Sequence, residues 1–292
     1  MTALLQISDP HFGTEQAPVV DALRTLVEEC RPEVVVMTGD VTQRATAAEF
    51  RLAAAFLASL ASPVRLVLPG NHDIPLLNLP LRLLAPFARF RRVFGAELEP
   101  VHDDPALQLT CVNTVVRYWH KDGAIAGAAI DRVARRLAAA DAGQLRVVVC
   151  HHPVLAARAE DEHNLLRGGD RAVRRWVDAG ADLIVGGHIH LPYVRPLKQR
   201  YPDLKRDAWA VQAGTAVSTR IRAGIPNSVN LIRAGEDGHR PACTIERWDY
   251  RGAAGRFERI AAERLEPDRT AVNPGRADPA GAGSPEPARR RA

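Results

Sequence analysis

The chain has 292 residues, of which 46% are hydrophobic and 25% charged, so a sizeable core is expected and a disordered chain is excluded. The net charge is +5, but the residues from Pro267 onward hold five arginines against three acids, which leaves a small surplus elsewhere. No long basic stretch is interleaved with aromatic residues, which argues against a polynucleotide-binding groove.

The first 70 residues alternate short apolar runs with segments of helical period. Residues 3–8, 33–39 and 64–70 are predicted strands, and residues 18–31 and 46–60 between them are predicted helices. The strands are nearly continuous runs of Val, Leu and Ile, which is typical of sheets covered on both faces. A layered α/β architecture is therefore expected.

The middle of the chain repeats this alternation. The further strands and helices are expected, in chain order, at residues 107–113, 127–141, 145–153, 170–180 and 181–187. Residues 208–215, 228–233 and 242–250 resemble shorter strands in hairpin or meander connection, so we expect a second, antiparallel sheet packed against the first. The predicted fold class is α/β: a four-layer α/β/β/α sandwich of two mixed sheets flanked by helices.

Two segments stand apart from this core. Residues 74–100 carry an apolar stripe, prolines and arginines, which suits either a plain surface helix or helical turns over the mouth of a site. Residues 267–292 are dominated by Pro, Gly, Ala and Arg and are predicted to be a disordered tail. The expected organisation is one domain over residues 1–266, followed by this tail.

Five of the predicted strands end in residues that can bind metal ions. In open α/β sheets the carboxyl ends of the strands face one crevice, so side chains distant in sequence converge there. The candidates are, in chain order, Asp9, His11, Asp40, Asn71, His151, His188 and His190.

The types of these side chains indicate which metals they would hold. Carboxylates, an amide carbonyl and imidazoles form a mixed nitrogen and oxygen site that suits Mn, Fe, Zn or Co. Seven groups are too many for one ion. With one carboxylate shared, they supply about four ligands to each of two ions, the arrangement that holds cations ~3.5–4 Å apart for in-line displacement at phosphorus.

The motifs D-x-H, G-D, G-N-H-D, H-x-P and G-H-x-H follow one another in this order over roughly residues 1–235. Together they resemble the calcineurin-like metallophosphoesterase superfamily. The resemblance implies one metal bound by Asp9, His11 and His190, a second bound by Asn71, His151 and His188, and Asp40 as the bridging ligand.

The same resemblance implies roles for the neighbouring residues. His72 would contact a phosphoryl oxygen of the substrate and help to protonate the leaving alcohol, with Asp73 as its orienting partner. Asn71 would contact the substrate as well as a metal. Hydrolysis would proceed by attack of a hydroxide held between the ions, without a phosphoenzyme.

The forms D-P-H, G-N-H-D, H-H-P and G-H-I-H resemble the bacterial class III cyclic-nucleotide phosphodiesterase branch. This implies an intracellular phosphodiesterase that acts on a small substrate such as a cyclic nucleotide. The alternatives are a DNA-repair-type nuclease, a phosphomonoesterase, and a scaffold that has kept the fold without catalysis.

Other polar residues near the motifs are expected to line the pocket, form turns or lie on the surface. His152 is expected to line the pocket without binding metal, and Asn113 to form a turn. Thr215 and Arg220 are weaker pocket candidates. Solvated positions are expected for His102, His120, His163 and His239, and a basic helix face for Arg82, Arg89, Arg91 and Arg92.

The expected location is the cytoplasm. Residues 1–12 contain neither a basic start nor a long apolar run, so no secretory signal or membrane span is predicted there. The four cysteines lack a C-x-x-C pair and are interpreted as reduced, packed thiols. The expected partner is a small phosphoester, neither nucleic acid nor a membrane is expected, and a homodimer is left open.

Overall fold

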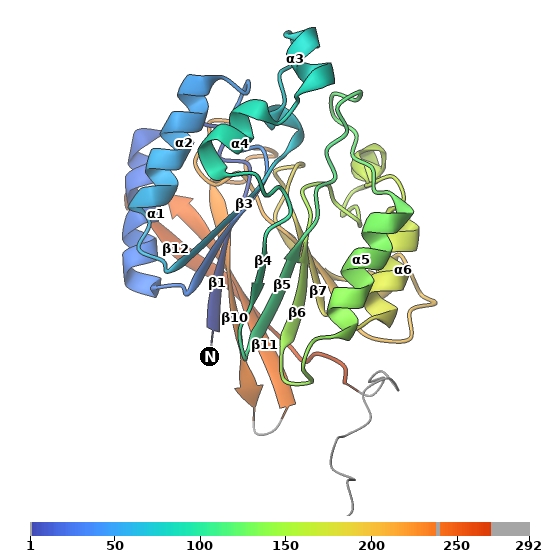
Figure 1. The fold of residues 1–292 in the computed structure, drawn as a ribbon. Helices are drawn as coiled ribbons and strands as arrows, with labels where there is room; N and C mark the ends of the chain where they lie inside the picture. The colour runs from blue at the N-terminus through green and yellow to red at the C-terminus, as the bar shows by residue number, and fades with distance from the viewer. Residues whose placement is uncertain (1, 238–239, 270–292) are drawn as a thin grey trace, which may run out of the picture.

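The computed structural model describes residues 2–237 and 240–269 (Figure 1). Two sheets pack face to face, with α1 and α2 on the outer face of one and α5 and α6 on the outer face of the other. The helices are α1 (Ala17–Cys30), α2 (Ala47–Ser59), α3 (Leu79–Leu84), α4 (Ala88–Phe94), α5 (Gly127–Ala138) and α6 (Gly169–Asp178).

The first sheet has the strand order β12-β11-β10-β1-β2-β3. Its first three strands in sequence run parallel, whereas β10, β11 and β12 are antiparallel to their neighbours. The strands are β1 (Thr2–Ile7), β2 (Val34–Thr38), β3 (Val64–Leu68), β10 (Ser228–Asp237), β11 (Arg240–Arg251) and β12 (Arg256–Leu265).

The second sheet has the strand order β4-β5-β6-β7-β9-β8. The four inner strands run parallel, and the two edge strands are antiparallel to them. The strands are β4 (Val101–Asp103), β5 (Leu107–Cys111), β6 (Leu145–Val149), β7 (Leu183–Gly186), β8 (Tyr193–Pro196) and β9 (Trp209–Gln212).

Successive side chains of a strand point to opposite faces of its sheet, and this divides the hydrophobic core into three layers. In β1, Leu5 and Ile7 pack against α1 and α2, whereas Leu4 points into the layer between the sheets. In β6, Val147 points into that central layer and Val148 packs against α5 and α6. Both faces of β1 and of β6 are therefore buried, which explains their continuous apolar runs in the sequence.

The predicted four-layer sandwich of two mixed sheets is confirmed, but the expectation that the late strands form a separate antiparallel sheet is wrong. Strand β10 pairs antiparallel with β1, with Leu231 opposite Leu5, so it extends the first sheet. Strand β9 pairs parallel with β7, with Ala210 opposite Ile184, so it extends the second. Strands from the C-terminal part of the chain therefore join both sheets, β10 at the free edge of β1 and β9 at the free edge of β7.

Residues 74–100 form α3 and α4. Helix α4 packs on α2, where Phe90 is fully buried and its ring lies 6.1 Å from that of Phe50. Helix α3 stands at the top of the molecule in Figure 1. The expected tail begins with described residues, and Arg269 pairs with Asp182 on the second sheet. Residues 270–292 of that tail lie outside the described residues.

No helix in the described part of the chain is both long enough and apolar enough to cross a membrane.

Candidate metal centre

The ligand candidates lie at the carboxyl ends of strands, in an unusual backbone conformation. Five of the seven have positive φ angles between 43° and 73°. A left-handed conformation is unfavourable for residues with a Cβ and persists where the surrounding structure enforces it, commonly at functional sites. These five residues are Asp9, His11, Asp40, His188 and His190.

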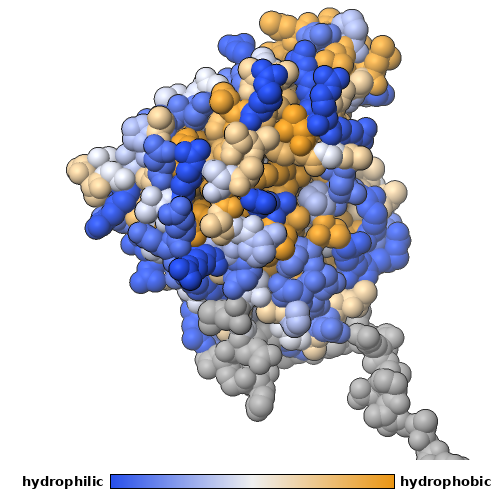
Figure 2. All heavy atoms as spheres, turned by 60° about the vertical axis from the view of Figure 1, so that its left-hand side comes forward, coloured by the Kyte–Doolittle hydropathy of each residue, from blue (hydrophilic) through white to orange (hydrophobic). Residues whose placement is uncertain are grey.

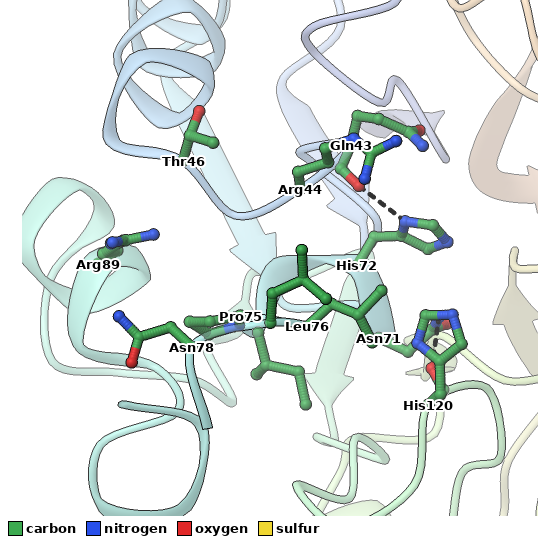
Figure 3. A pocket seen from close by; sticks show the side chains of 12 residues that line it. Gln43, Arg44, Thr46, Asn71, His72, Pro75, Leu76, Asn78, Arg89 and His120 are labelled. Atoms are coloured by element: carbon green, nitrogen blue, oxygen red, sulfur yellow. Dashed lines mark hydrogen bonds between the residues drawn. The ribbon is translucent and has the colours of Figure 1, made fainter. Parts of the chain in front are cut away.

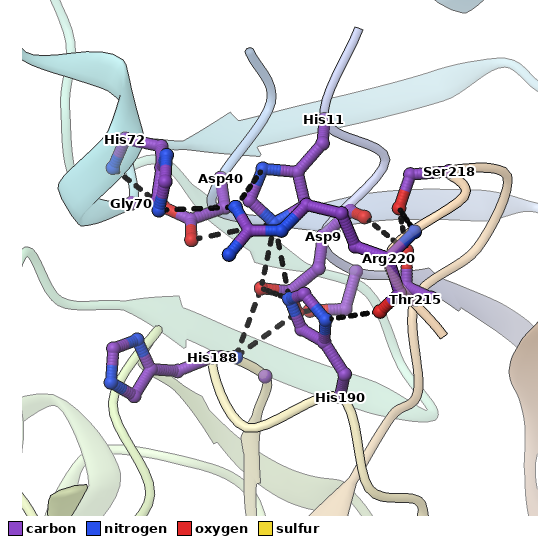
Figure 4. A network of polar contacts seen from close by, with 12 residues as sticks. Asp9, His11, Asp40, Gly70, His72, His188, His190, Thr215, Ser218 and Arg220 are labelled. Atoms are coloured by element: carbon purple, nitrogen blue, oxygen red, sulfur yellow. Dashed lines mark hydrogen bonds and ion pairs between the residues drawn. The ribbon is translucent and has the colours of Figure 1, made fainter. Parts of the chain in front are cut away.

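Three of the side chains form a first donor group. Oδ1 of Asp9 lies 3.4 Å from Nε2 of His190 and 4.0 Å from Nε2 of His11. The two imidazole Nε2 atoms are 3.1 Å apart. These donor atoms converge on one point from the loop that follows β1 and from the loop that follows β7 (Figure 4).

Another three side chains form a second donor group. Oδ1 of Asn71 lies 2.9 Å from Nδ1 of His188 and 3.1 Å from Nε2 of His151. Asp40 lies between the two groups, with Oδ1 3.3 Å from Nε2 of His151 and Oδ2 3.7 Å from Nε2 of His11. One carboxylate therefore faces both groups.

Hydrogen bonds fix the orientation of these ligand candidates. Nδ1 of His151 bonds the Thr38 carbonyl at 2.9 Å, and Nδ1 of His190 bonds the Arg220 carbonyl at 2.7 Å, so both Nε2 atoms point into the site. The Asn71 amide nitrogen donates to the carbonyl of His120 at 3.1 Å, which turns the amide oxygen toward the imidazoles.

Burial and charge set the protonation of the site. Burial lowers the pKa of His11 to about 3, and burial together with the charge of His151 lowers the pKa of His188 to about 3. Burial raises the pKa of Asp9, but the His190 imidazole outweighs it and the pKa falls to about 2. Burial lowers the pKa of His151, but the charge of Asp40 raises it to about 9.

This donor set fits two metal ions. At neutral pH the imidazoles of His11 and His188 are neutral and offer lone pairs, and the carboxylate of Asp9 is ionised. The negative charge of Asp40 favours a proton on His151. A bound cation would replace that proton. Three donors on each side of one carboxylate suit two ions of the Mn, Fe, Zn or Co type.

His72 lies beside the donor groups with its ring held in place. Its Nδ1 bonds the Gln43 carbonyl at 2.9 Å, and its backbone nitrogen donates to Oδ1 of Asp40 at 2.8 Å. Nη1 of Arg220 lies 3.2 Å from Nε2 of His72, 3.4 Å from Nδ1 of His11 and 3.1 Å from Oε1 of Gln43. Figure 4 shows this guanidinium between the two rings.

The expectation that Asp73 orients His72 is wrong. The buried carboxylate of Asp73 accepts hydrogen bonds from the backbone nitrogens of Val41, Thr42 and Gly70 and from the Thr42 hydroxyl, at 2.8–3.0 Å. These contacts tie the loops after β2 and β3 together. Burial and the charge of Asp40 raise the pKa of Asp73 to about 7. The orienting contact to His72 comes from the Gln43 carbonyl instead.

The other polar candidates have structural roles. His152 uses both ring nitrogens, one with the Thr114 hydroxyl at 2.7 Å and one with the Lys121 carbonyl at 2.9 Å. The Asn113 side chain accepts from the backbone nitrogen of Val115 at 3.0 Å, which is a turn contact. Thr215 is buried and donates to the Asp9 carbonyl at 2.6 Å, so it supports the loop that carries Asp9.

Some expectations about histidines and arginines need correction. His120 is exposed, as expected for a solvated residue, and it also lines a pocket with its ring 6.0 Å from that of His72. His163 lines the groove over the donor groups, and His102 bonds Asp104 at 2.9 Å. His239 lies outside the described residues. Arg91 and Arg92 are exposed as expected, whereas Arg82 is buried and Arg89 lines the pocket beside His72.

Comparisons with known proteins identify a family match and a shared fold. Residues 2–192 match the family described as calcineurin-like phosphoesterase. The purple acid phosphatase PPD1 of yellow lupin (Lupinus luteus) has a TM-score of 0.65 at 12% identity, over 93% of this chain and 55% of the lupin chain. A dimetal phosphatase from Danio rerio has a TM-score of 0.64 at 13% identity, over 91% of this chain and 99% of the Danio rerio chain. At these identities the two structures show a shared fold. No curated protein matches the sequence significantly.

Proposed function

The chain belongs to the calcineurin-like phosphoesterase family, and from this premise we propose that it is a metal-dependent phosphodiesterase acting on a small substrate such as a cyclic nucleotide. Asp9, His11 and His190 would hold one ion, and Asn71, His151 and His188 the other. The observation that carries this proposal is the position of Asp40, whose two carboxylate oxygens face the two donor groups.

The protein's own residues supply the remaining functions. Bound divalent ions would provide Lewis acidity at the phosphoryl group and lower the pKa of water. Arg220, which forms no ion pair with a described carboxylate, would bind a phosphoryl oxygen. His72, whose Nδ1–H donates to the Gln43 carbonyl, would take up a proton from water at Nε2 and pass it to the leaving oxygen.

The charged side chains that line the groove bear on the choice between a diester and a monoester. A phosphomonoester carries up to two negative charges at neutral pH and a diester carries one. Arg220 and Lys121 line the groove without an ion pair to a described carboxylate, whereas Arg222 is already neutralised by Asp161 at 2.7 Å and Glu160 at 3.1 Å. The preference for a diester rests on the resemblance of the motifs to the cyclic-nucleotide phosphodiesterase branch. A phosphomonoesterase is the second candidate, because both similar structures are named phosphatases.

A panel of substrates tests this proposal. The Mn²⁺-loaded protein is assayed with cyclic AMP, cyclic GMP, bis(p-nitrophenyl) phosphate, p-nitrophenyl phosphate and single-stranded DNA. We expect metal-dependent turnover of small diesters that exceeds turnover of the monoester. Faster monoester hydrolysis would assign a phosphomonoesterase, and preference for DNA a nuclease. A chain that binds two ions and hydrolyses none of these would fit a scaffold.

A further inference from the structure

A pocket of about 410 Å³ lies beside His72. It shares Asn71 and His72 with the groove over the two donor groups, so these residues form the boundary between the two spaces. Figure 3 shows His72 and His120 on one side of this pocket and Arg89 and Asn78 on the other. A substrate whose phosphate lies at the donor groups can therefore extend into this pocket.

One wall of the pocket is apolar and continues onto an exposed apolar surface. Ile74, Pro75, Leu76 and Leu77 line the pocket. Leucines 76 and 77 are 41% and 85% exposed, and three more exposed leucines follow along the chain, at 60%, 44% and 85%: Leu79, Leu83 and Leu84. Figure 2 shows apolar side chains gathered at the top of the molecule, where α3 lies in Figure 1.

The polarity of this segment is inverted relative to an ordinary surface helix. Arg82 is only 6% exposed and donates to the carbonyls of Pro75 at 3.1 Å and Trp119 at 2.7 Å. Asn78 caps the helix by accepting from the backbone nitrogen of Leu81 at 3.1 Å. The polar side chains therefore fix the segment from inside while the leucines face outward, an arrangement that leaves apolar surface in water unless a ligand covers it.

The pocket also carries positive charge. Arg44 and Arg89 line it, and neither pairs with a carboxylate among the residues described. Nη1 of Arg89 donates to the Ala45 carbonyl at 2.8 Å, which holds the guanidinium at the pocket. None of the pocket's described lining residues is acidic. An anionic phosphoester with an apolar chain matches both the charge and the apolar lining of the pocket.

We propose that the substrate is an amphiphilic phosphoester, whose apolar chain lies in the pocket along Leu76 and Leu77 and continues over the leucines of α3. This inference rests on the proposed phosphoesterase activity and narrows its substrate class. An alkyl chain is the favoured occupant because Pro75, Leu76 and Leu77 line the pocket beside His72, and the exposed leucines of α3 follow them in the sequence.

Competitive inhibition by alkyl phosphates of increasing length tests the proposal. Hydrolysis of bis(p-nitrophenyl) phosphate by the Mn²⁺-loaded protein is inhibited with methyl, butyl and octyl phosphate, each below its critical micelle concentration. A fully buried methylene contributes about 0.8 kcal/mol, so even partial contact should make octyl phosphate bind at least about tenfold more tightly than methyl phosphate.

Two variants test whether the alkyl chain of the inhibitor lies along Leu76 and Leu77. In Leu76→Ser/Leu77→Ser the ratio of the methyl to the octyl inhibition constant should fall toward one, and because a ratio is measured, any general loss of activity divides out. Leu52→Ser removes a leucine of α2 that is 49% exposed and should keep the wild-type ratio.

The outcomes separate this inference from the proposed function. Absence of metal-dependent bis(p-nitrophenyl) phosphate hydrolysis would overturn the proposed function itself. With that activity present, equal inhibition constants across the series would overturn the amphiphilic substrate. A dependence on chain length that survives in the double variant would also overturn it. So would a dependence that appears only above the critical micelle concentration, because it would report binding to a lipid aggregate. Dimerisation abolished by the double variant would assign the leucines to a second copy and also overturn it.

Discussion

Nη1 of Arg220 lies 3.2 Å from Nε2 of His72. Arg220 reaches the site from the loop after β9, and Gln43 and His11 hold the same guanidinium nitrogen. A phosphoryl oxygen bound near His72 would therefore meet a positive charge that is already positioned.

Replacement of Arg220 by methionine should lower kcat/KM by about 10- to 100-fold, because a charge-assisted hydrogen bond to the phosphoryl group is lost. Metal content should not change. The matched control is Arg174→Met, since Arg174 is exposed and pairs with Asp203 on the surface. Equal losses in both variants, or none in Arg220→Met, would remove Arg220 from substrate binding.

His72→Ala should leave metal binding intact and lower turnover by about 10²-fold or more, the range for removal of a general acid or charge stabiliser. The ring contacts the Gln43 carbonyl and Arg220, but no donor atom of the six terminal ligands is bonded to it in the structure. Steady-state kinetics and metal analysis of the same preparation check this. Unchanged turnover would show that His72 has been given the wrong role.

Asp73→Asn should destabilise the fold and only secondarily affect activity. The carboxylate accepts three backbone N–H bonds, and an amide nitrogen in place of one oxygen would face a buried donor, which costs about 1–3 kcal/mol. Chemical unfolding should report the loss, whereas kcat of the folded fraction should stay within a few-fold of wild type. A stable variant with abolished turnover would restore a catalytic role to Asp73.

Gly187→Ala should disrupt the first donor group. A methyl group at this position would overlap the Ser8 hydroxyl and Oδ2 of Asp9, and the two atoms are hydrogen-bonded at 2.5 Å. We expect loss of one equivalent of metal and of activity. Gly252→Ala, where the added methyl meets no atom within 4 Å, is the control. Full metal occupancy in Gly187→Ala would show that Asp9 can move without losing its ion.

Removal of the metals should lower the thermal unfolding temperature, and Mn²⁺ should restore it. The site buries Asp9 and Asp40 as neighbouring carboxylates, and an ion present at 100 times its dissociation constant stabilises the native state by about 2.7 kcal/mol. Calorimetry with and without chelator checks this, with Asp40→Asn as the comparison. Identical transitions for loaded and stripped protein would contradict a metal site here.

The convergence of the ligand candidates was predictable because each follows a strand whose apolar run is evident in the sequence. Parallel neighbouring strands bring their carboxyl ends to one edge, so Asp9 after β1 and Asp40 after β2 had to approach each other. His151 follows β6 of the second sheet, and its approach depends on how the two sheets pack. The positions of Gln43 and Arg220 were not predictable in the same way. Their approach to His72 depends on how the loops after β2 and β9 return to the site, which no local pattern encodes.

The order of the strands in the sheets could not be predicted from local sequence patterns either. Periodicity identified residues 228–233 as a strand, but it does not state which edge that strand joins, and the pairing with β1 depends on contacts more than 200 residues apart in sequence. The role of Asp73 was also hidden. Its neighbour His72 faces the groove, whereas the 3₁₀ turn over Asn71–Asp73 directs the Asp73 carboxylate into the loops behind it.

Counting the metal ions per chain tests the central claim most directly. The protein is stripped, reloaded with Mn²⁺, freed of excess metal and measured by mass spectrometry of the metal against protein concentration. We expect two ions per chain, with a loss of metal in Asp40→Asn, because that carboxylate faces both donor groups. A saturated value of one ion per chain, or two ions retained in full by Asp40→Asn, would contradict it.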